Sequence, residues 1–269
     1  MRTPTFSSIS TLAVGACLSI SSIQAASVVS FWGFAEDYDA GDGVNEIDFT
    51  PDVDNTAGAA LLRAYLGNAD ELDGNGGGGI AYNSPTSGVS YAPTNSIKFD
   101  DLRGGGNDFS LGGVSMFQVD SGSGLETRDF GNDALIYLQL NLTNWQDVSV
   151  RFDVEGTPGP ETLPTSFDVF YRTGGSGTWF REPDQNNIPI TGYTTIDAEN
   201  AQAAVGPLNL NAAVDGQEVV EIIISDFAET GNGEMELDNF ELVGTQVPEP
   251  GSLALLVIGG VSLLRRRRG

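Results

Sequence analysis

The chain has 269 residues, of which 40% are hydrophobic, 35 are glycine and none is histidine. This composition suits a turn-rich globular fold, and it excludes catalysis or zinc binding through histidine. The formal net charge is −25, and five of the 12 basic residues, Arg2 and the run from Arg265 to Arg268, lie at the two ends. Because an acidic body repels phosphate backbones, nucleic acid is excluded as a partner.

Residues 1–26 predict a secretory signal peptide. An apolar stretch follows Arg2, and Ala25 and Ala26 offer small side chains for cleavage. Two alternatives remain open: a buried helix, or a lipoprotein leader in which Cys17 would be acylated. Since Cys17 is the single cysteine of the chain, disulfides and thiolate metal sites are not expected.

The first half of the body gives few clear patterns. Residues 28–34 are rich in β-branched and aromatic side chains and predict a strand. The acidic stretch 36–55 departs from the spacing of an EF-hand loop, so we interpret it as a solvated loop or an irregular calcium loop. The spacing of Leu61, Leu62, Tyr65 and Leu66 predicts a short helix over residues 55–66.

The second half alternates apolar and polar residues with a period of two. Val150 and Phe152, for example, alternate with Arg151 and Asp153. Strands are predicted over residues 135–142, 148–155, 167–172, 205–210, 219–224 and 235–243, with a hairpin turn at 173–177 and a return strand from 178. The strand at 219–224 is nearly all apolar and is expected to be central.

These strands predict an all-β fold, an antiparallel β-sandwich that forms one domain over residues 27–246. Its core is expected to contain seven inward-facing side chains: Val150, Phe152, Val169, Tyr171, Ile222, Ile224 and Leu237. The apolar phase shifts between Leu237 and Phe240, which predicts a β-bulge at Asp238 and Asn239.

Asp238 is the candidate metal ligand. A carboxylate buried inside a strand needs a cation or hydrogen-bond donors, and calcium suits oxygen ligands. The alternative is an exposed aspartate at a sheet edge.

Residues 171–175 and 233–240 resemble jelly-roll modules of the carbohydrate-binding kind, over about residues 130–245. This resemblance implies a jelly-roll-like sandwich. It also implies a structural calcium between the first and last strands, where Asp238 would meet acidic residues near Glu36.

The C-terminus has three parts in order. Val247, Pro248, Glu249 and Pro250 precede an apolar stretch at 251–264, and Arg265, Arg266, Arg267 and Arg268 follow it. As a helix the apolar stretch would span about 21 Å, short against a hydrocarbon core of about 30 Å. The arginine run is expected to stay cytoplasmic, which leaves the body outside.

Residues 247–269 resemble the PEP-CTERM sorting signal. The resemblance implies a short transmembrane helix, export by a Gram-negative bacterium, processing by an exosortase, and a place at the cell envelope, cell surface or extracellular matrix. Many proteins that bear this signal accompany exopolysaccharide production.

The predicted function is an exported, surface-sorted, acidic β-sandwich protein that is structural or associated with extracellular polysaccharide. It is expected not to be an enzyme. The alternatives are a calcium-dependent carbohydrate-binding module, and a hydrolase or lyase that acts on glycans through two carboxylates. Trp32, Trp145 and Trp179 either stack on sugar rings or, by the simpler interpretation, fill the core.

Overall fold

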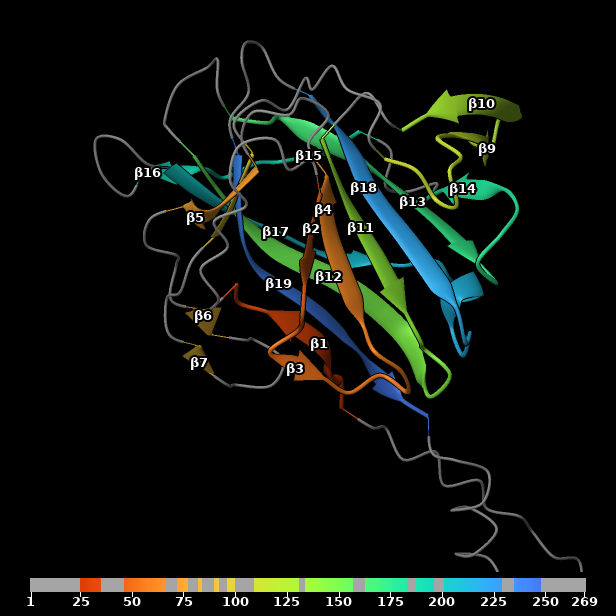
Figure 1. Cartoon of the computed structure of the whole chain (residues 1–269). Helices are drawn as coiled ribbons and strands as arrows, with labels where there is room; N and C mark the ends of the chain where they lie inside the picture. Colours follow the sequence, from red (N-terminus) through yellow and green to blue (C-terminus); the bar gives the residue numbers. More distant parts are fainter. Residues whose placement is uncertain are drawn as a thin grey trace, which may run out of the picture.

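The computed structural model consists almost wholly of β-strands (Figure 1). It describes residues 25–34, 46–65, 72–76, 82–83, 90–91, 96–99, 109–130, 134–156, 163–182, 187–195, 201–228 and 235–247. The described strands form two large sheets, and β6 (Tyr82–Asn83) and β7 (Ser90–Tyr91) form a separate small pair. Within these ranges the single helical element is the three-residue 3-10 turn η1 (Ala212–Val214).

The first sheet has the order β16-β17-β12-β19-β1-β3. Its strands are β16 (Thr194–Thr195), β17 (Ala201–Asn209), β12 (Trp145–Gly156), β19 (Met235–Gln246), β1 (Ser27–Trp32) and β3 (Val53–Asp54). Two further strands extend it beside β19: β8 (Ser96–Phe99) and β5 (Leu72–Gly76). The first and last long strands of the body, β1 and β19, are therefore antiparallel neighbours.

The second sheet has the order β10-β9-β14-β13-β18-β11-β4-β2 and lies in front of the first in Figure 1. Its strands are β10 (Leu125–Asp129), β9 (Met116–Asp120), β14 (Trp179–Arg181), β13 (Ser166–Thr173), β18 (Val220–Ala228), β11 (Leu135–Leu140), β4 (Leu61–Tyr65) and β2 (Glu46–Phe49), with β15 (Ile188–Pro189) paired to β13. All pairings are antiparallel except that of β14 with β9. The expected central strand, β18, does lie between β13 and β11.

The inter-sheet core fills the space between the two sheets. It contains the inward-facing side chains of both, including all seven that the alternating pattern predicts: Val150, Phe152, Val169, Tyr171, Ile222, Ile224 and Leu237. From β11 onward the long strands alternate between the sheets. The antiparallel β-sandwich prediction is confirmed.

A second cluster, the outer cluster, lies on the other face of the second sheet. It consists of Tyr65, Phe109, Phe117, Val119, Phe130, Leu135, Tyr137, Phe170, Trp179 and Ile223. The hairpin of β9 and β10 supplies part of it and lies beside β14 at the edge of the sheet (Figure 1). Several strands of this sheet are thus apolar on both faces.

The predicted helix at residues 55–66 is wrong. Residues 61–65 form β4, which pairs with β11 and β2. Leu62 and Ala64 face the inter-sheet core, whereas Leu61 and Tyr65 face the outer cluster. Apolar side chains on both faces of a strand placed Leu61, Leu62 and Tyr65 at a spacing that resembles a helix.

The predicted bulge is confirmed. The register of β12 with β19 shifts between Arg151 and Asp153, and Asn239 has a left-handed φ of 51°. Among the described residues, no helix is long and apolar enough to cross a membrane. The expected signal peptide up to residue 24, residues 36–45 of the acidic stretch and the apolar stretch at 251–264 lie outside the described residues. The rest of the acidic stretch, predicted as a loop, contains strands β2 and β3.

Candidate functional site

A cleft of about 750 Å³ opens on the outward face of the second sheet. We call it the outer cleft. It lies between the segment that leads into β9 and the turn that joins β13 to β14, and β11, β13 and β18 form its floor. Its lining residues are Leu111, Gly112, Val114, Met116, Phe117, Gln118, Tyr137, Gln139, Arg172, Gly175, Ser176, Gly177, Thr178 and Glu221.

The floor of the outer cleft contains a hydrogen-bonded group of three side chains from adjacent strands. Tyr137 donates its hydroxyl to Glu221 Oε1 at 2.7 Å. Arg172 donates Nε to Glu221 Oε2 at 2.5 Å and Nη2 to Oε1 at 2.9 Å. Burial, followed by the hydrogen bond to Glu221, raises the pKa of Tyr137 well above its usual range. The tyrosine therefore stays protonated and remains a donor.

Arg172 is held from its other side by aromatic rings. Its guanidinium lies 4.6 Å from the ring centroid of Trp179 and 5.8 Å from that of Phe117. The Arg172 and Glu221 side chains are 8% and 5% exposed, so this ion pair is largely buried, and its remaining exposed edge borders the cleft. A buried pair with bidentate geometry neutralises its own charge. The floor is thus polar but carries no net charge.

The two walls of the outer cleft differ in chemistry. One carries apolar side chains that are unusually open to solvent, Val114 at 50% and Met116 at 58% exposure. The other is the turn around Gly175, Ser176 and Gly177, with Thr178 at its end. Gly175 and Gly177 have φ values of 71° and 95°, which glycine adopts without strain. Gln139 is exposed on β11 between the walls.

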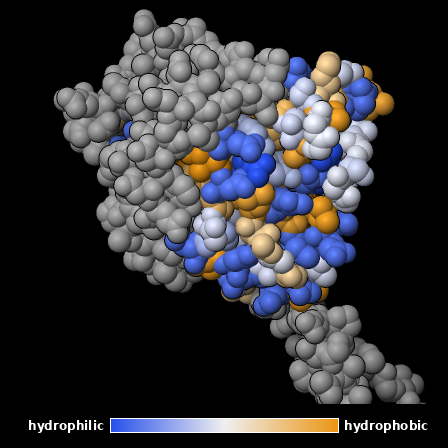
Figure 2. Space-filling view, viewed as in Figure 1, coloured by the Kyte–Doolittle hydropathy of each residue, from blue (hydrophilic) through white to orange (hydrophobic). Residues whose placement is uncertain are grey.

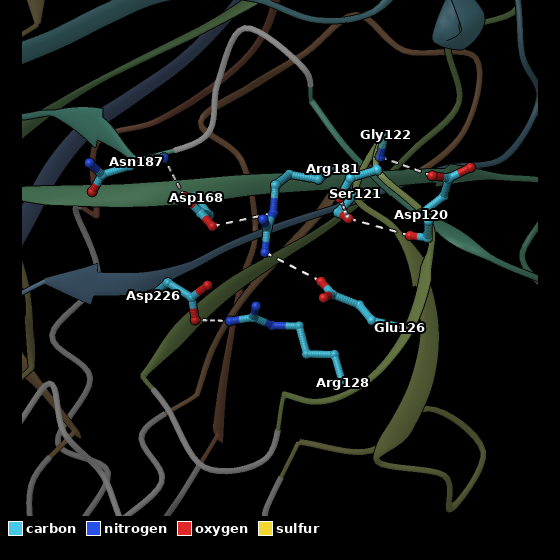
Figure 3. Close-up of polar contacts among 11 residues, drawn as sticks. Asp120, Ser121, Gly122, Glu126, Arg128, Asp168, Arg181, Asn187 and Asp226 are labelled. Atoms are coloured by element: carbon cyan, nitrogen blue, oxygen red, sulfur yellow. Dashed lines mark hydrogen bonds and ion pairs between the residues drawn. The ribbon is translucent and has the colours of Figure 1, made fainter.

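A network of ion pairs attaches the β9–β10 hairpin to the sheet (Figure 3). Arg128 pairs with Asp226 of β18. Arg181 of β14 bridges Glu126 of the hairpin at 3.5 Å and Asp168 of β13 at 3.4 Å. These pairs fix the hairpin that supplies one wall of the outer cleft.

Phe170 contributes to the same attachment. Its ring centroid lies 4.8 Å from the Arg128 guanidinium carbon and 5.3 Å from that of Arg181. At the hairpin tip, Asp120 Oδ1 accepts the Gly122 N–H at 2.9 Å, which closes the turn. The hairpin is therefore held by charge and by aromatic contacts.

Asp238, the predicted calcium ligand, does not lie in the outer cleft. It is 1% exposed in β19, and its Oδ1 accepts the backbone N–H of Asn239 at 2.7 Å. Asp153, its cross-strand partner, accepts a hydrogen bond from Asn239 Nδ2 at 3.1 Å. The described residues contain no group of three or more side chains arranged to hold a metal. Glu36 lies outside them, and calcium binding stays a prediction.

The three tryptophans are core residues, as the simpler interpretation predicts. Trp32 and Trp179 are 0% exposed and Trp145 is 3% exposed. The indole N–H groups of Trp32 and Trp145 donate to the carbonyls of Phe49 and Asn55 at 3.1 and 3.2 Å. Stacking of these tryptophans on sugar rings is therefore wrong.

Sequence reasoning did not find the floor of the outer cleft. One signal was present: Arg172 directly follows the apolar run at residues 169–171, and Glu221 lies between Val220 and Ile222. Charged residues are rarely buried without a partner. Nothing in the sequence shows that these two meet, because 49 positions separate them.

The comparison with protein-family models finds the PEP-CTERM protein-sorting motif at residues 246–268. That range contains residues 247–268 of the predicted signal at 247–269, including Val247, the Pro-Glu-Pro residues and the four arginines. The motif implies export, surface sorting in Gram-negative bacteria and processing by an exosortase. No curated protein and no solved structure matches the chain.

Of the residues assigned to the sorting signal, the structure describes Val247 alone. Its backbone N–H donates to the Asn144 carbonyl at 2.8 Å, directly after β19 ends at Gln246.

Proposed function

We propose that the mature protein is a non-catalytic component of the cell surface that associates with extracellular polysaccharide. The observation that carries this proposal is the sorting motif, which begins where β19 ends. The full chain has a formal net charge of −25, and removal of Arg2 and the arginine run makes the exported protein more acidic still. Such a charge keeps the protein soluble, and its surface repels other acidic proteins. Figure 2 shows hydrophilic residues interspersed with separate apolar ones over the described part of one face.

The outer cleft supports a binding role rather than catalysis. Most glycoside hydrolases use two carboxyl groups about 5–10 Å apart. Among the residues that line the cleft, Glu221 is the single acidic side chain, and it is bound to Arg172 and Tyr137. The alternation of the long strands between the sheets supports the jelly-roll interpretation and, with it, a role beside glycans.

Sorting is tested by following the protein in its host with and without the exosortase. We expect the wild-type protein to reach the surface with a mature N-terminus near Ala26 and without the arginine run, as measured by intact mass. Glu249→Ala should block processing, whereas Glu218→Ala, a matched change at an exposed site in the domain, should not. Full-length protein that remains in the cytoplasm would contradict the proposal.

Association with polysaccharide is tested by co-sedimentation. Processed protein released from the cells is mixed with extracellular polysaccharide purified from the same host. We expect the protein to sediment with the polymer. Equal recovery with and without polymer would refute the association while leaving the sorting result intact.

A further inference from the structure

We propose that the outer cleft binds a neutral saccharide segment, made of sugar units without carboxylate or sulfate groups. This inference rests on the proposed association with polysaccharide and names its site and ligand class. The cleft volume of about 750 Å³ lies within the range of about 300–1,000 Å³ that small-molecule sites occupy. It can therefore enclose a short stretch of a chain.

The charges of the lining residues favour a neutral ligand. The lining contains one cation and one anion, Arg172 and Glu221, which neutralise each other through two hydrogen bonds. An incoming anion would have to compete with Glu221 for Arg172 and would approach a chain with a net charge of −25. An incoming cation would meet Arg172 on the same floor. Neither kind of charge finds a matching partner.

The chemistry of the lining matches a sugar ring, which has apolar C–H faces and hydroxyl edges. Val114 and Met116 supply an exposed apolar wall for the faces. Gln139, Ser176 and Thr178 supply donors and acceptors for the hydroxyls. The cleft thus has an apolar side and a polar side. Ligand sites in proteins commonly combine an apolar lining with a few polar groups in this way.

The floor disfavours a purely apolar occupant. Glu221 accepts three hydrogen bonds, and the two oxygens of a carboxylate can accept about four. A hydroxyl group can donate to the remaining position, whereas an apolar side chain would cover it without a partner. Covering a charged polar group in this way costs free energy. A ligand rich in hydroxyls is therefore favoured over a hydrophobic peptide.

The test uses the processed protein released from the host and isothermal titration with defined probes. The neutral probes are hexasaccharides of β-1,4-glucose, β-1,3-glucose and β-1,4-mannose, and the acidic probe is a hexasaccharide of galacturonic acid. We expect at least one neutral probe to bind and the acidic probe not to bind. Because the ligand is uncharged, affinity should change little between low and high salt.

Two variants and two matched controls locate the binding. Gln139→Ala and Met116→Ala should each weaken binding by about tenfold, which corresponds to the loss of about 1.4 kcal/mol. Gln146→Ala and Leu125→Ala alter exposed residues outside the cleft and should leave it unchanged. Thermal melts verify that all four variants fold.

The outcomes separate this inference from the proposed function. If host polysaccharide retains wild-type protein and both cleft variants equally, the association stands and the cleft assignment is overturned. If the acidic probe binds and the neutral probes do not, the ligand class is overturned. If neither the polymer nor any probe binds, both proposals are overturned.

Discussion

The inter-sheet core and the outer cluster use opposite faces of the same strands. In β18, Ile222 and Ile224 face the inter-sheet core, whereas Ile223 faces the outer cluster. The core is closed by two sheets that cover each other. Among the residues that the structure describes, the outer cluster is closed by one short hairpin, β9–β10, and by Phe109 and Phe130 beside it. Apolar side chains of one strand are thus buried by a whole sheet on one face and by a short hairpin on the other.

Because of this difference, the inter-sheet core and the outer cluster are expected to contribute differently to stability. Losing a contact in the core affects both sheets at once, because every long strand contributes to it. Losing a contact in the outer cluster affects the hairpin first. Regions covered by little structure open at lower free energy than cores, and binding sites are commonly found beside them. The outer cleft, for which we propose a saccharide ligand, lies beside such a region.

The largest expected effect comes from Phe152→Ala in the inter-sheet core. Phe152 is 0% exposed, and its ring is stacked on Phe240 with centroids 5.5 Å apart. We expect the free energy of unfolding to fall by about 3–5 kcal/mol. Urea denaturation measures it. Phe180→Ala, at a residue that is 41% exposed, is the control and should cost much less. Equal losses in the two variants would contradict the assignment of the core.

A smaller effect, with a different pattern, is expected from Phe130→Ala in the outer cluster. Phe130 contacts Phe170 and Trp179 at centroid distances of 5.0 and 6.0 Å. We expect a loss of about 2–3 kcal/mol, because the hairpin at the sheet edge can relax around the cavity. Hydrogen exchange should accelerate in residues 116–129 but not in residues 220–224.

The control for this variant lies on the same hairpin. Leu125 is 67% exposed, and Leu125→Ala should change stability by no more than about 0.5 kcal/mol. Exchange that accelerates equally in β9 and in β18 would show that the outer cluster and the core unfold as one unit.

The outer face of the first sheet sharpens the comparison, because it buries carboxylates such as Asp153 as well as the apolar side chains of Val28 and Phe31. Asp153 is 6% exposed, and burial raises its pKa above the ordinary value of 3.8. The folded state therefore holds this proton to a higher pH than the unfolded chain does. The stability that the group contributes is present below pH 3.8 and is lost as pH rises through the raised pKa.

Asp153→Asn should accordingly stabilise the protein at pH 7, by about 1 kcal/mol or roughly 2–4 °C in melting temperature. The gain should disappear as pH falls towards the ordinary aspartate value. Melts at several pH values measure it, with the exposed Glu218→Gln as the control. If Asp153→Asn is less stable than wild type at pH 7, the argument from the raised pKa of Asp153 is contradicted. If that loss of stability appears only when calcium is added, the result supports the predicted metal at Asp238.

Much of the inner architecture could be predicted from the sequence. The alternation in residues 148–154 placed Val150 and Phe152 in the core, and the phase break beside Asp238 located the bulge. Strands with both faces buried were harder to predict from the sequence. In β4, apolar side chains on both faces of the strand gave a spacing that resembles a helix. The local pattern does not show whether a side chain packs in the inter-sheet core or in the outer cluster.

The sequence by itself determined the sorting motif, the acidic charge and the alternating strands, because each depends on residues close together in the chain. Only the tertiary structure decided which strands would be neighbours and what would cover their outward faces. Tyr137, Arg172 and Glu221 meet because β18 lies between β11 and β13. Pairing of strands far apart in sequence depends on the whole set of competing pairings, so the polar floor of the outer cleft became visible only in the folded sheet.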